Sequence, residues 1–304
     1  MEPLRLLAPA KINLHLRVGP PSADGFHPLL SWFVTLGLCD TLTLWPAPTA
    51  SAKLVLACDD PALPCDGGNL VVRAACALAG AIAPGRELSP INAMLHKRIP
   101  MGAGLGGGSS DGAAALRGLN QLWNAGWDAH ELAKLGATLG SDLPFFFHGP
   151  SSICTGRGEI VRPTPRPAAR WAVLILPGIH MPTPAVYKQF DQLRLVDEAR
   201  LRDEPDWAAW AKLPATELLP LLVNDLEAPA FALSPALGEL RAAAERGLGR
   251  PVRMSGSGSS LFTLFDERAE AGEASRKLGT EDRFAGIRFE CVELSPKFAD
   301  DLSG

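Results

Sequence analysis

The sequence predicts an α+β fold in two parts. Segments with strand-like alternation and segments with helical periodicity are intermixed along the 304 residues, without a regular βαβ repeat and without an internal repeat. A proline- and arginine-rich stretch at residues 161–170, VRPTPRPAAR, precedes a second run of strands and helices. We therefore expect one domain over residues 1–160 and another over residues 161–304.

The N-terminal part is expected to open with strands. Apolar and polar residues alternate over residues 11–18, which predicts a strand with one buried face and with Lys11 and Asn13 on its polar face. Residues 31–45 are rich in Trp, Phe, Val, Thr and Leu, most of which favour strands. We expect two strands in this run, meeting near Asp40.

Helices are expected next. Residues 69–83 form an alanine-rich helical pattern, and another helix is expected to begin near Ser109. A third should begin at Asp128, an N-cap residue with Glu131 three positions later, and should end at Gly140. The second helix places one apolar stripe toward the core, formed by Leu116, Leu119 and Trp123.

The C-terminal part is expected to restart with a strand. Residues 171–176, WAVLIL, form an apolar run of strand length. A helix follows that should be capped by Ser234 and closed by Gly247. Strands are then expected at residues 260–265 and 287–294, with another helix between them.

Composition and charge exclude several classes of protein. The formal net charge of −4 gives no electrostatic reason to expect nucleic acid or an anionic membrane as a partner. No apolar run approaches the roughly 18 residues of a membrane span, and the N-terminus lacks the pattern of a signal peptide. We therefore expect a cytoplasmic protein. Six scattered cysteines without metal-ligand spacing are expected to be free thiols: Cys39, Cys58, Cys65, Cys76, Cys154 and Cys291.

The most informative segment is the glycine-rich stretch at residues 100–110, PMGAGLGGGSS. Five glycines in seven residues allow left-handed dihedrals, so that successive N–H groups can point inward and form an anion-binding nest. The stretch leads into a predicted helix, whose N-terminal amides and dipole also attract phosphate. The hydroxyls of Ser109 and Ser110 can cap this helix or reach a phosphate or Mg²⁺.

Other kinds of glycine-rich site fit this segment less well. A dinucleotide-binding pattern is present, but the preceding segment is charged and ends in proline instead of forming an apolar strand. A Walker A loop needs a Gly-Lys pair, and a protein kinase needs HRD and DFG motifs; the chain has none of these. A flexible loop without a ligand seldom leads directly into an alanine-rich helix. A second cluster, SGSGSS at residues 255–260, would alone indicate a hairpin loop, and beside the first it predicts a second wall of a phosphate pocket.

Three motifs in this order resemble those of the GHMP kinase superfamily, named for galactokinase and for homoserine, mevalonate and phosphomevalonate kinases. They are PAKIN at residues 9–13, the stretch at 100–110 and the cluster at 255–260. The resemblance extends from residue 8 to about residue 265. Further segments resemble the branch that phosphorylates 4-diphosphocytidyl-2-C-methyl-D-erythritol: APAKINLHL (8–16), ADGFH (23–27), NLVVRA (69–74), GSDLPF (140–145), PTP (182–184) and NDLE (224–227).

The resemblance implies a two-domain GHMP kinase fold, with an N-terminal domain like ribosomal protein S5 and a ferredoxin-like C-terminal domain. ATP and the acceptor would meet in the cleft between them. The implied reaction moves the γ-phosphate of ATP to the 2-hydroxyl of the cytidine diphosphate-linked methylerythritol, in the non-mevalonate isoprenoid pathway. Mg²⁺ would arrive with ATP, so no metal site built from protein side chains is expected. We expect a monomer or a weak homodimer.

The resemblance assigns catalytic roles to Lys11 and Asp142. Asp142 follows Gly140, the expected end of a helix, where the helix dipole disfavours an acid. It would take or orient the proton of the attacking hydroxyl. Lys11 would keep Asp142 ionised and stabilise charge on the transferred phosphoryl group, and Asn13 would orient the substrate or Lys11. An aspartate that caps a turn and a solvated lysine at a sheet edge are the structural alternatives.

The resemblance also assigns the acceptor's binding site. Phe26, His27 and Tyr187 are similar to a cytosine pocket, in which two aromatic planes hold a pyrimidine and a histidine bonds its edge. The family more often has tyrosine at the position of Phe26; phenylalanine still stacks but has no hydroxyl for a polar contact. Thr183 and Pro184 would shape the same wall.

The ATP side would use the glycine-rich stretch and residues that border the adenine. Residues expected to border the adenine are Asn69, Leu70, Val71 and Lys97, although Leu70 and Val71 also fit ordinary core positions. The stretch itself contributes Pro100, Met101, Gly102, Ala103, Gly104, Leu105, Gly106, Gly107, Gly108, Ser109 and Ser110.

Two other functions remain open from the sequence. One is a GHMP kinase for another small alcohol, of the homoserine or mevalonate type, but these alcohols have no base to stack on Phe26 or Tyr187. The other is a nucleotide-binding sensor without catalysis, which predicts the loss of Lys11 or Asp142. Both residues are present.

Overall fold

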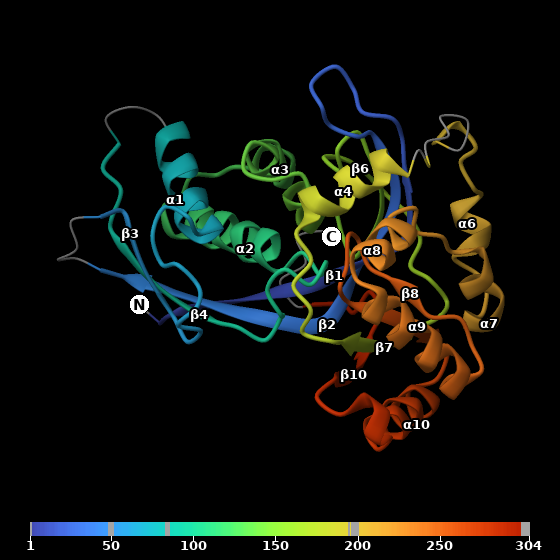
Figure 1. Cartoon of the computed structure of the whole chain (residues 1–304). Helices are drawn as coiled ribbons and strands as arrows, with labels where there is room; N and C mark the ends of the chain where they lie inside the picture. Colours follow the sequence, from blue (N-terminus) through green and yellow to red (C-terminus); the bar gives the residue numbers. More distant parts are fainter. Residues whose placement is uncertain (1, 48–51, 83–85, 194, 196–200, 299–304) are drawn as a thin grey trace.

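Figure 1 shows the computed structural model, which describes residues 2–47, 52–82, 86–193, 195 and 201–298. The larger sheet has the strand order β3-β4-β2-β5-β6, with β1 paired to β2. Strands β3 and β4 are parallel, and the remaining neighbours are antiparallel. The strands of this sheet are β1 (Leu4–Val18), β2 (Leu29–Pro46), β3 (Leu54–Cys58), β4 (Ile91–His96), β5 (Ser151–Thr155) and β6 (Ile160–Pro163).

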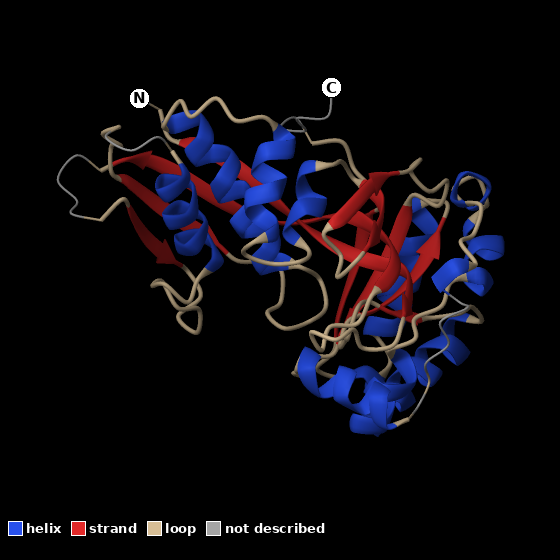
Figure 2. Ribbon diagram, turned by 90° about the horizontal axis from the view of Figure 1, so that it is seen from above, coloured by secondary structure: helices blue, strands red, loops and turns tan. Residues whose placement is uncertain are grey.

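Helices cover one face of this sheet (Figures 1 and 2). They are α1 (Leu70–Ala81), α2 (Gly107–Leu122), α3 (Ala129–Ala137) and the 3₁₀ helix η1 (Leu143–Phe147). The predicted apolar stripe of α2 is buried in the core beneath them. The capping box of Asp128 and Glu131 is present at the start of α3 as predicted.

Two helix boundaries in this region differ from the prediction. Helix α2 begins at Gly107, with Gly106 as its N-cap. No side-chain hydrogen bond caps this helix, so neither Ser109 nor Ser110 acts as its cap. Glycine occupies the cap because its φ there is +67°, in the left-handed region. Helix α3 ends at Ala137, three residues before Gly140, because Thr138 takes the C-cap position and bonds back to the last turn.

The first two strands also differ from the prediction. Strand β2 is continuous through Asp40, because that buried carboxylate accepts backbone hydrogen bonds from Arg98 and Ile99 instead of ending a strand. Strand β1 has no exposed polar face at Lys11, Asn13 and His15, since segments distant in sequence pack over these side chains. The alternation of apolar and polar residues correctly predicted the strand, but it did not predict that distant segments would bury its polar face.

The second sheet is antiparallel, with the order β10-β7-β9-β8. Its strands are β7 (Trp171–Leu176), β8 (Arg253–Met254), β9 (Leu261–Phe265) and β10 (Arg288–Glu293). Strands β7, β9 and β10 lie close to the predicted ranges, and the short β8 was not predicted. Helix α9 ends at Leu248, one residue beyond the predicted Gly247, and Gly249, with φ +63°, is its C-cap. Ser234 is its N-cap as predicted, but makes no side-chain cap hydrogen bond. The other helices are α4 (Thr183–Gln192), α6 (Trp207–Trp210), α7 (Ala215–Leu218), η2 (Leu219–Leu221), α8 (Glu227–Leu233), α9 (Pro235–Leu248), α10 (Arg268–Gly279) and η3 (Asp282–Phe284).

A shared hydrophobic cluster joins the two sheets. It combines side chains of β1 and β2 with side chains of β7, β9 and β10, including Leu36, Leu174 and Phe262. Backbone hydrogen bonds continue the contact, for example from the amide of Ser295 to the carbonyl of Thr35 at 2.8 Å. Within the described ranges, no helix is both long and apolar enough to span a bilayer.

Candidate active site

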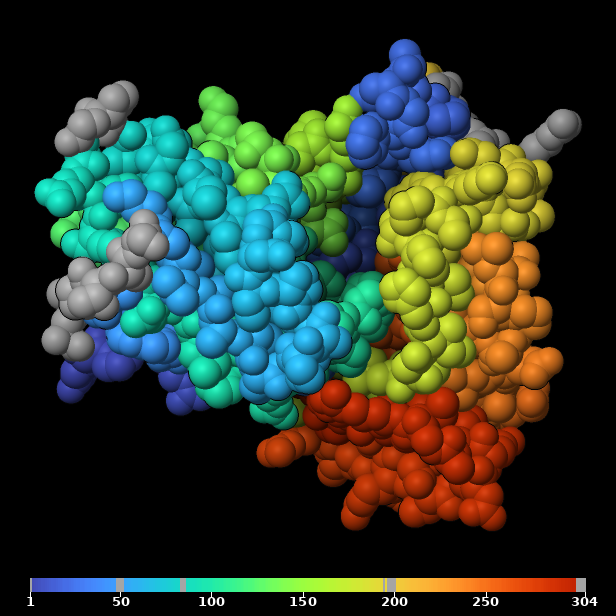
Figure 3. All heavy atoms as spheres, turned by 60° about the vertical axis from the view of Figure 1, so that its left-hand side comes forward, coloured from blue at the N-terminus to red at the C-terminus, as the bar shows by residue number. Residues whose placement is uncertain are grey.

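A pocket of about 940 Å³ is lined by residues of β1 and β2 of the larger sheet and by loops and helix termini packed over them. Figure 3 shows the hollow between the light-blue chain that precedes α1 and the yellow α4. Its lining combines β1, the loop that leads into α2, the start of η1, the loop after β1, α4 and the loop after β8. These segments are far apart in sequence, so only the folded chain brings them together.

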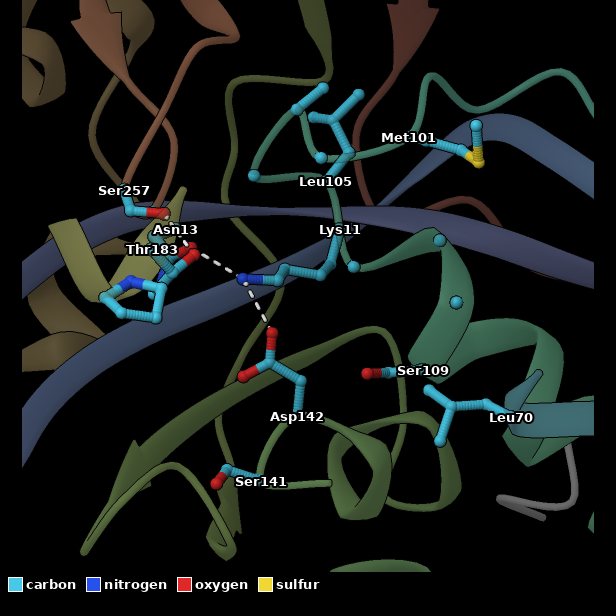
Figure 4. A pocket seen from close by; sticks show the side chains of 18 of the residues that line it. Lys11, Asn13, Leu70, Met101, Leu105, Ser109, Ser141, Asp142, Thr183 and Ser257 are labelled. Atoms are coloured by element: carbon cyan, nitrogen blue, oxygen red, sulfur yellow. Dashed lines mark hydrogen bonds and ion pairs between the residues drawn. The ribbon is translucent and has the colours of Figure 1, made fainter. Parts of the chain in front are cut away.

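A buried lysine and an aspartate form the centre of the pocket (Figure 4). Lys11 is only 4% exposed, and its Nζ lies 3.1 Å from Asp142 Oδ2. The same ammonium donates a hydrogen bond of 2.7 Å to Asn13 Oδ1 and lies 4.3 Å from the centroid of the Phe33 ring. Asp142 precedes η1, and about a third of its side chain is exposed to the pocket. A fixed cation therefore faces an accessible carboxylate.

The first glycine loop (residues 100–106) wraps around this lysine. Gly102, Gly104 and Gly106 have φ values of +63°, +75° and +67°, which other residues adopt at a cost. A Cβ added to Gly106 would lie 2.8 Å from Lys11 Cγ, so the backbone approaches the lysine as closely as a glycine allows. The Leu105 carbonyl also accepts a hydrogen bond of 2.9 Å from the Lys11 amide.

The second glycine loop (residues 255–260) lies directly against the first. Ser255 Oγ donates to the Gly104 carbonyl at 2.9 Å and accepts from the Asn13 amide at 3.2 Å. The side-chain amide of Asn224 fixes this loop by donating hydrogen bonds of 2.8 Å to the backbone carbonyls of Met254 and Gly256. Gly256 and Ser257 line the pocket, so the loop forms part of its wall.

The residues expected to border the adenine divide into two groups. Asn69, the N-cap of α1, and Leu70 line the pocket. Val71 does not, because it points into the hydrophobic core and is fully buried there. Ser110 likewise lies in the interior behind the loop, whereas the neighbouring Ser109 lines the pocket.

Lys97 lines the pocket, but its ammonium is held by two carboxylates. Its Nζ donates to Asp40 Oδ2 and to Asp111 Oδ2, the latter at 2.7 Å. Asp40 is completely buried and Asp111 is 2% exposed. Burial, partly offset by Lys97 and reinforced by Asp40, raises the pKa of Asp111 to about 7. Neither acid was predicted from the sequence to belong to the site; the position of Asp111 directly after the motif serines was the available signal.

The opposite wall of the pocket carries the aromatic residues. Phe26, His27, Thr183, Pro184 and Tyr187 all line it. The rings of His27 and Tyr187 lie 5.1 Å apart, and Thr183 Oγ1 bonds Ser257 Oγ of the second glycine loop at 2.8 Å. Burial, followed by the negative charge of Asp142, raises the pKa of Tyr187 to about 12, so the phenol stays protonated close to the carboxylate.

Comparison with known proteins identifies the family. Residues 69–150 match the family model described as GHMP kinases N terminal domain, and residues 204–282 match GHMP kinases C terminal. A 4-diphosphocytidyl-2-C-methyl-D-erythritol kinase of Synechococcus sp. (strain CC9902) is 39% identical, over 94% of this chain and 95% of that protein. One of Nocardioides sp. (strain ATCC BAA-499 / JS614) is 41% identical, over 84% of this chain and 86% of that protein.

Comparison with solved structures agrees with this family assignment. A crystal structure of 4-(cytidine 5'-diphospho)-2C-methyl-D-erythritol kinase superposes with a TM-score of 0.75 at 36% identity, covering 97% of this chain and all of that one. A homoserine kinase from Cytophaga hutchinsonii superposes with a TM-score of 0.69 at 19% identity, covering 96% and 95% of the two chains, which shows the shared fold alone. The chain is therefore a two-domain α+β kinase that belongs to the 4-diphosphocytidyl-2-C-methyl-D-erythritol kinase family of GHMP kinases.

Proposed function

We propose that this kinase transfers the γ-phosphate of ATP to the 2-hydroxyl of 4-diphosphocytidyl-2-C-methyl-D-erythritol, in the non-mevalonate route to isoprenoids. The observation that carries the proposal is one pocket in which the Lys11–Asp142 pair lies between a glycine loop and a wall of aromatic side chains. A nucleotide donor and an acceptor with a pyrimidine base can occupy the two sides together. The names of the relatives support the choice of acceptor.

On the donor side, the first glycine loop and the start of α2 would bind the phosphates of ATP. Backbone N–H groups of a loop with alternating left-handed residues, followed by a helix N-terminus, attract anions. Leu70 and Asn69 lie beside the loop and would border the adenine. The ammonium of Lys97, held by its two acids, would shape this side more than it would neutralise phosphate.

On the acceptor side, Phe26 and Tyr187 would contact the cytosine and His27 would contribute to the same wall. The imidazole of His27 is fixed, since its Nδ1 donates to the Gly19 carbonyl at 2.8 Å and its Nε2 lies 3.4 Å from Asp191. Thr183 and Pro184 begin α4 and would close the wall beside the second glycine loop. A rigid aromatic wall favours a flat ligand because little side-chain freedom is lost on binding.

At the centre, Asp142 would accept the proton of the 2-hydroxyl while the hydroxyl oxygen attacks the γ-phosphorus. The bond from that phosphorus to the ADP oxygen breaks, and ADP leaves with its electron pair. The ammonium of Lys11 lies 3.1 Å from Asp142 and would stabilise the negative charge that develops on the phosphoryl oxygens. Asn13 holds the lysine in place.

Mg²⁺ would enter bound to ATP. The described residues contain no group of three acidic, histidine or cysteine side chains suited to hold a metal ion. A Mg²⁺ ion that arrives with ATP would be held mostly by phosphate and water. Ser109, which lines the pocket, offers a hydroxyl that could reach the phosphate or its Mg²⁺.

We also propose that the chain divides into its two domains near residue 161. Strand β6 ends the larger sheet at Pro163, and β7 opens the second sheet at Trp171. The pocket would then lie in the cleft between the domains, with the donor loop on the N-terminal one and α4 on the C-terminal one.

The proposed reaction is tested by measuring ADP release from Mg-ATP with three acceptors. We expect turnover with 4-diphosphocytidyl-2-C-methyl-D-erythritol and none with homoserine or mevalonate. Turnover with one of these simple alcohols instead would contradict the pyrimidine role of Phe26 and Tyr187. Binding of ATP without turnover on any acceptor would indicate a sensor.

A further inference from the structure

Arg157 lies at the mouth of the pocket on the turn between β5 and β6. The turn is tied to the acceptor side of the pocket, because the Gly156 carbonyl accepts a hydrogen bond of 2.8 Å from the Leu29 amide. It also reaches the catalytic pair: a Cβ added to Gly158 would lie 3.6 Å from Asp142 Oδ1. One short turn therefore bonds the segment that follows Phe26 and lies close to the carboxylate of Asp142.

Arg157 covers the ring of Phe26. The guanidinium carbon lies 3.9 Å from the ring centroid, and the guanidinium also forms an ion pair with Asp24. Asp24 Oδ1 in turn accepts a hydrogen bond of 3.1 Å from the Phe26 amide. This bond, together with Arg157, keeps the pKa of Asp24 below its usual value, so the carboxylate stays charged. The three residues form a closed set of contacts around one aromatic ring.

The ring needs such support because 52% of Phe26 is exposed. A phenylalanine has no hydroxyl that could anchor it by a hydrogen bond. A planar guanidinium stacked on one face restricts the ring and leaves the opposite face for a base. Both residues line the pocket, so the restricted ring belongs to its wall.

We propose that Arg157 is a positioning residue for the acceptor: it holds Phe26 as the platform on which the pyrimidine base stacks, and so sets the affinity for cytidine-containing acceptors. The inference rests on the proposed function and adds a residue to its specificity. Arg157 acts through Phe26, so its effect should appear in acceptor binding and not in the phosphoryl transfer step.

The test is a double-mutant cycle on Arg157→Ala and Phe26→Ala, with initial rates measured against acceptor and against ATP. For Arg157→Ala we expect the acceptor KM to rise about 2- to 5-fold, the range of an exposed cation–π contact, with kcat and the ATP KM unchanged. In the Phe26→Ala background, the same substitution should change nothing further. Arg157→Lys should restore less than half of the loss, because an ammonium does not stack as a plane.

Arg162→Ala is the matched control, because Arg162 is an exposed, ion-paired arginine on the same hairpin that pairs with Glu204 and does not line the pocket. It should leave all three constants unchanged. Full additivity of Arg157→Ala and Phe26→Ala would overturn the proposal, since Arg157 would then bind the acceptor directly through its diphosphate. An acceptor KM as insensitive as that of the control would overturn it as well. Absence of turnover by the unmodified enzyme would instead overturn the proposed function.

Discussion

At the scale of single residues, the carboxylates of Asp40 and Asp111 both bind the ammonium of Lys97 beside the first glycine loop. Asp40 belongs to β2, Lys97 follows β4, and Asp111 lies in the first turns of α2. The set therefore connects the chain that enters the first glycine loop with the helix that leaves it. Asp111 Oδ1 is buried, and in the described part of the chain it has no hydrogen-bond partner. One negative charge in this set is only partly balanced.

This imbalance predicts how stability depends on pH. The pKa of Asp111 is about 7 in the folded chain and near 3.8 when unfolded, so the folded state retains a proton that the unfolded state releases. The contribution of Asp111 to the free energy of unfolding is then full below about pH 4 and declines as the pH rises to about 7. Asp111→Asn cannot titrate. The unfolding free energy of the unmodified chain, measured in urea from pH 5 to pH 8, should fall relative to that of the variant; parallel curves would contradict this.

These partners of Lys97 also show what a sequence can predict at this scale. Lys11 and Asp142 were assigned to one site because each lies in a motif, and the structure places their side chains 3.1 Å apart. Asp40 lies 57 positions from Lys97, in a strand-like run that gives no sign of a buried ion pair. Val71 was assigned to the pocket because it belongs to a motif, although its side chain packs in the core. A motif therefore predicts a segment, and packing decides which side chains face the ligand.

At the scale of elements, the two glycine loops act as one structure. Gly104 of the first and Ser255 of the second are in hydrogen-bond contact, and the Ser260 amide donates to the Ala103 carbonyl at 3.1 Å. A Cβ on Gly104 would lie 3.0 Å from the Gly258 carbonyl oxygen and closer still to that of Ser255. The left-handed conformation and the close approach both require glycine.

Gly104→Ala should therefore weaken ATP binding. We expect the ATP KM to rise at least tenfold, because the added methyl group forces the two loops apart. Gly126→Ala is the control: its φ of +76° matches the +75° of Gly104, but no atom lies within 4 Å of its added Cβ. Both variants should lose about 1 kcal/mol of stability from backbone strain. An equal and small change in the ATP KM of the two variants would show that the contact between the loops is not needed.

Helices and strands marked by neighbouring residues were predictable from the sequence. The burial of a side chain by segments far away in the sequence was not. The capping box at Asp128 and the apolar run of β7 are properties of a few neighbouring residues. The burial of His15 is different, since its ring lies edge-on to Trp207 and Trp210, almost 200 positions away. Alternation alone could not show that this polar face would be covered.

At the scale of the whole molecule, the site depends on the packing of one sheet against the other. Leu36 of β2 is fully buried in the cluster that also contains Leu174 of β7 and Phe262 of β9. An isolated bridge pairs Leu36 with Leu294, which follows β10. Donor and acceptor sides of the pocket are therefore fixed relative to each other by a continuous core.

This shared core predicts a single cooperative unfolding transition. Leu36→Ala should lower the free energy of unfolding by about 2–5 kcal/mol, as expected for a leucine lost from a packed interior. The transition should remain single when followed by circular dichroism and by tryptophan fluorescence. Leu233→Ala, at a leucine 43% exposed, is the control and should change stability by less than about 0.5 kcal/mol. Two separate transitions in the unmodified chain would contradict the shared core.

The central claim is that Asp142, held beside Lys11, directs the γ-phosphate of ATP to the 2-hydroxyl of the cytidyl acceptor. The most direct test follows the reaction by phosphorus NMR with the unmodified enzyme and with Asp142→Asn, and measures ATP binding by both. We predict a new phosphomonoester signal on the acceptor, formed about 10²- to 10⁴-fold more slowly by the variant at unchanged ATP affinity. A variant as fast as the unmodified enzyme, or an acceptor without the phosphomonoester, would contradict the account.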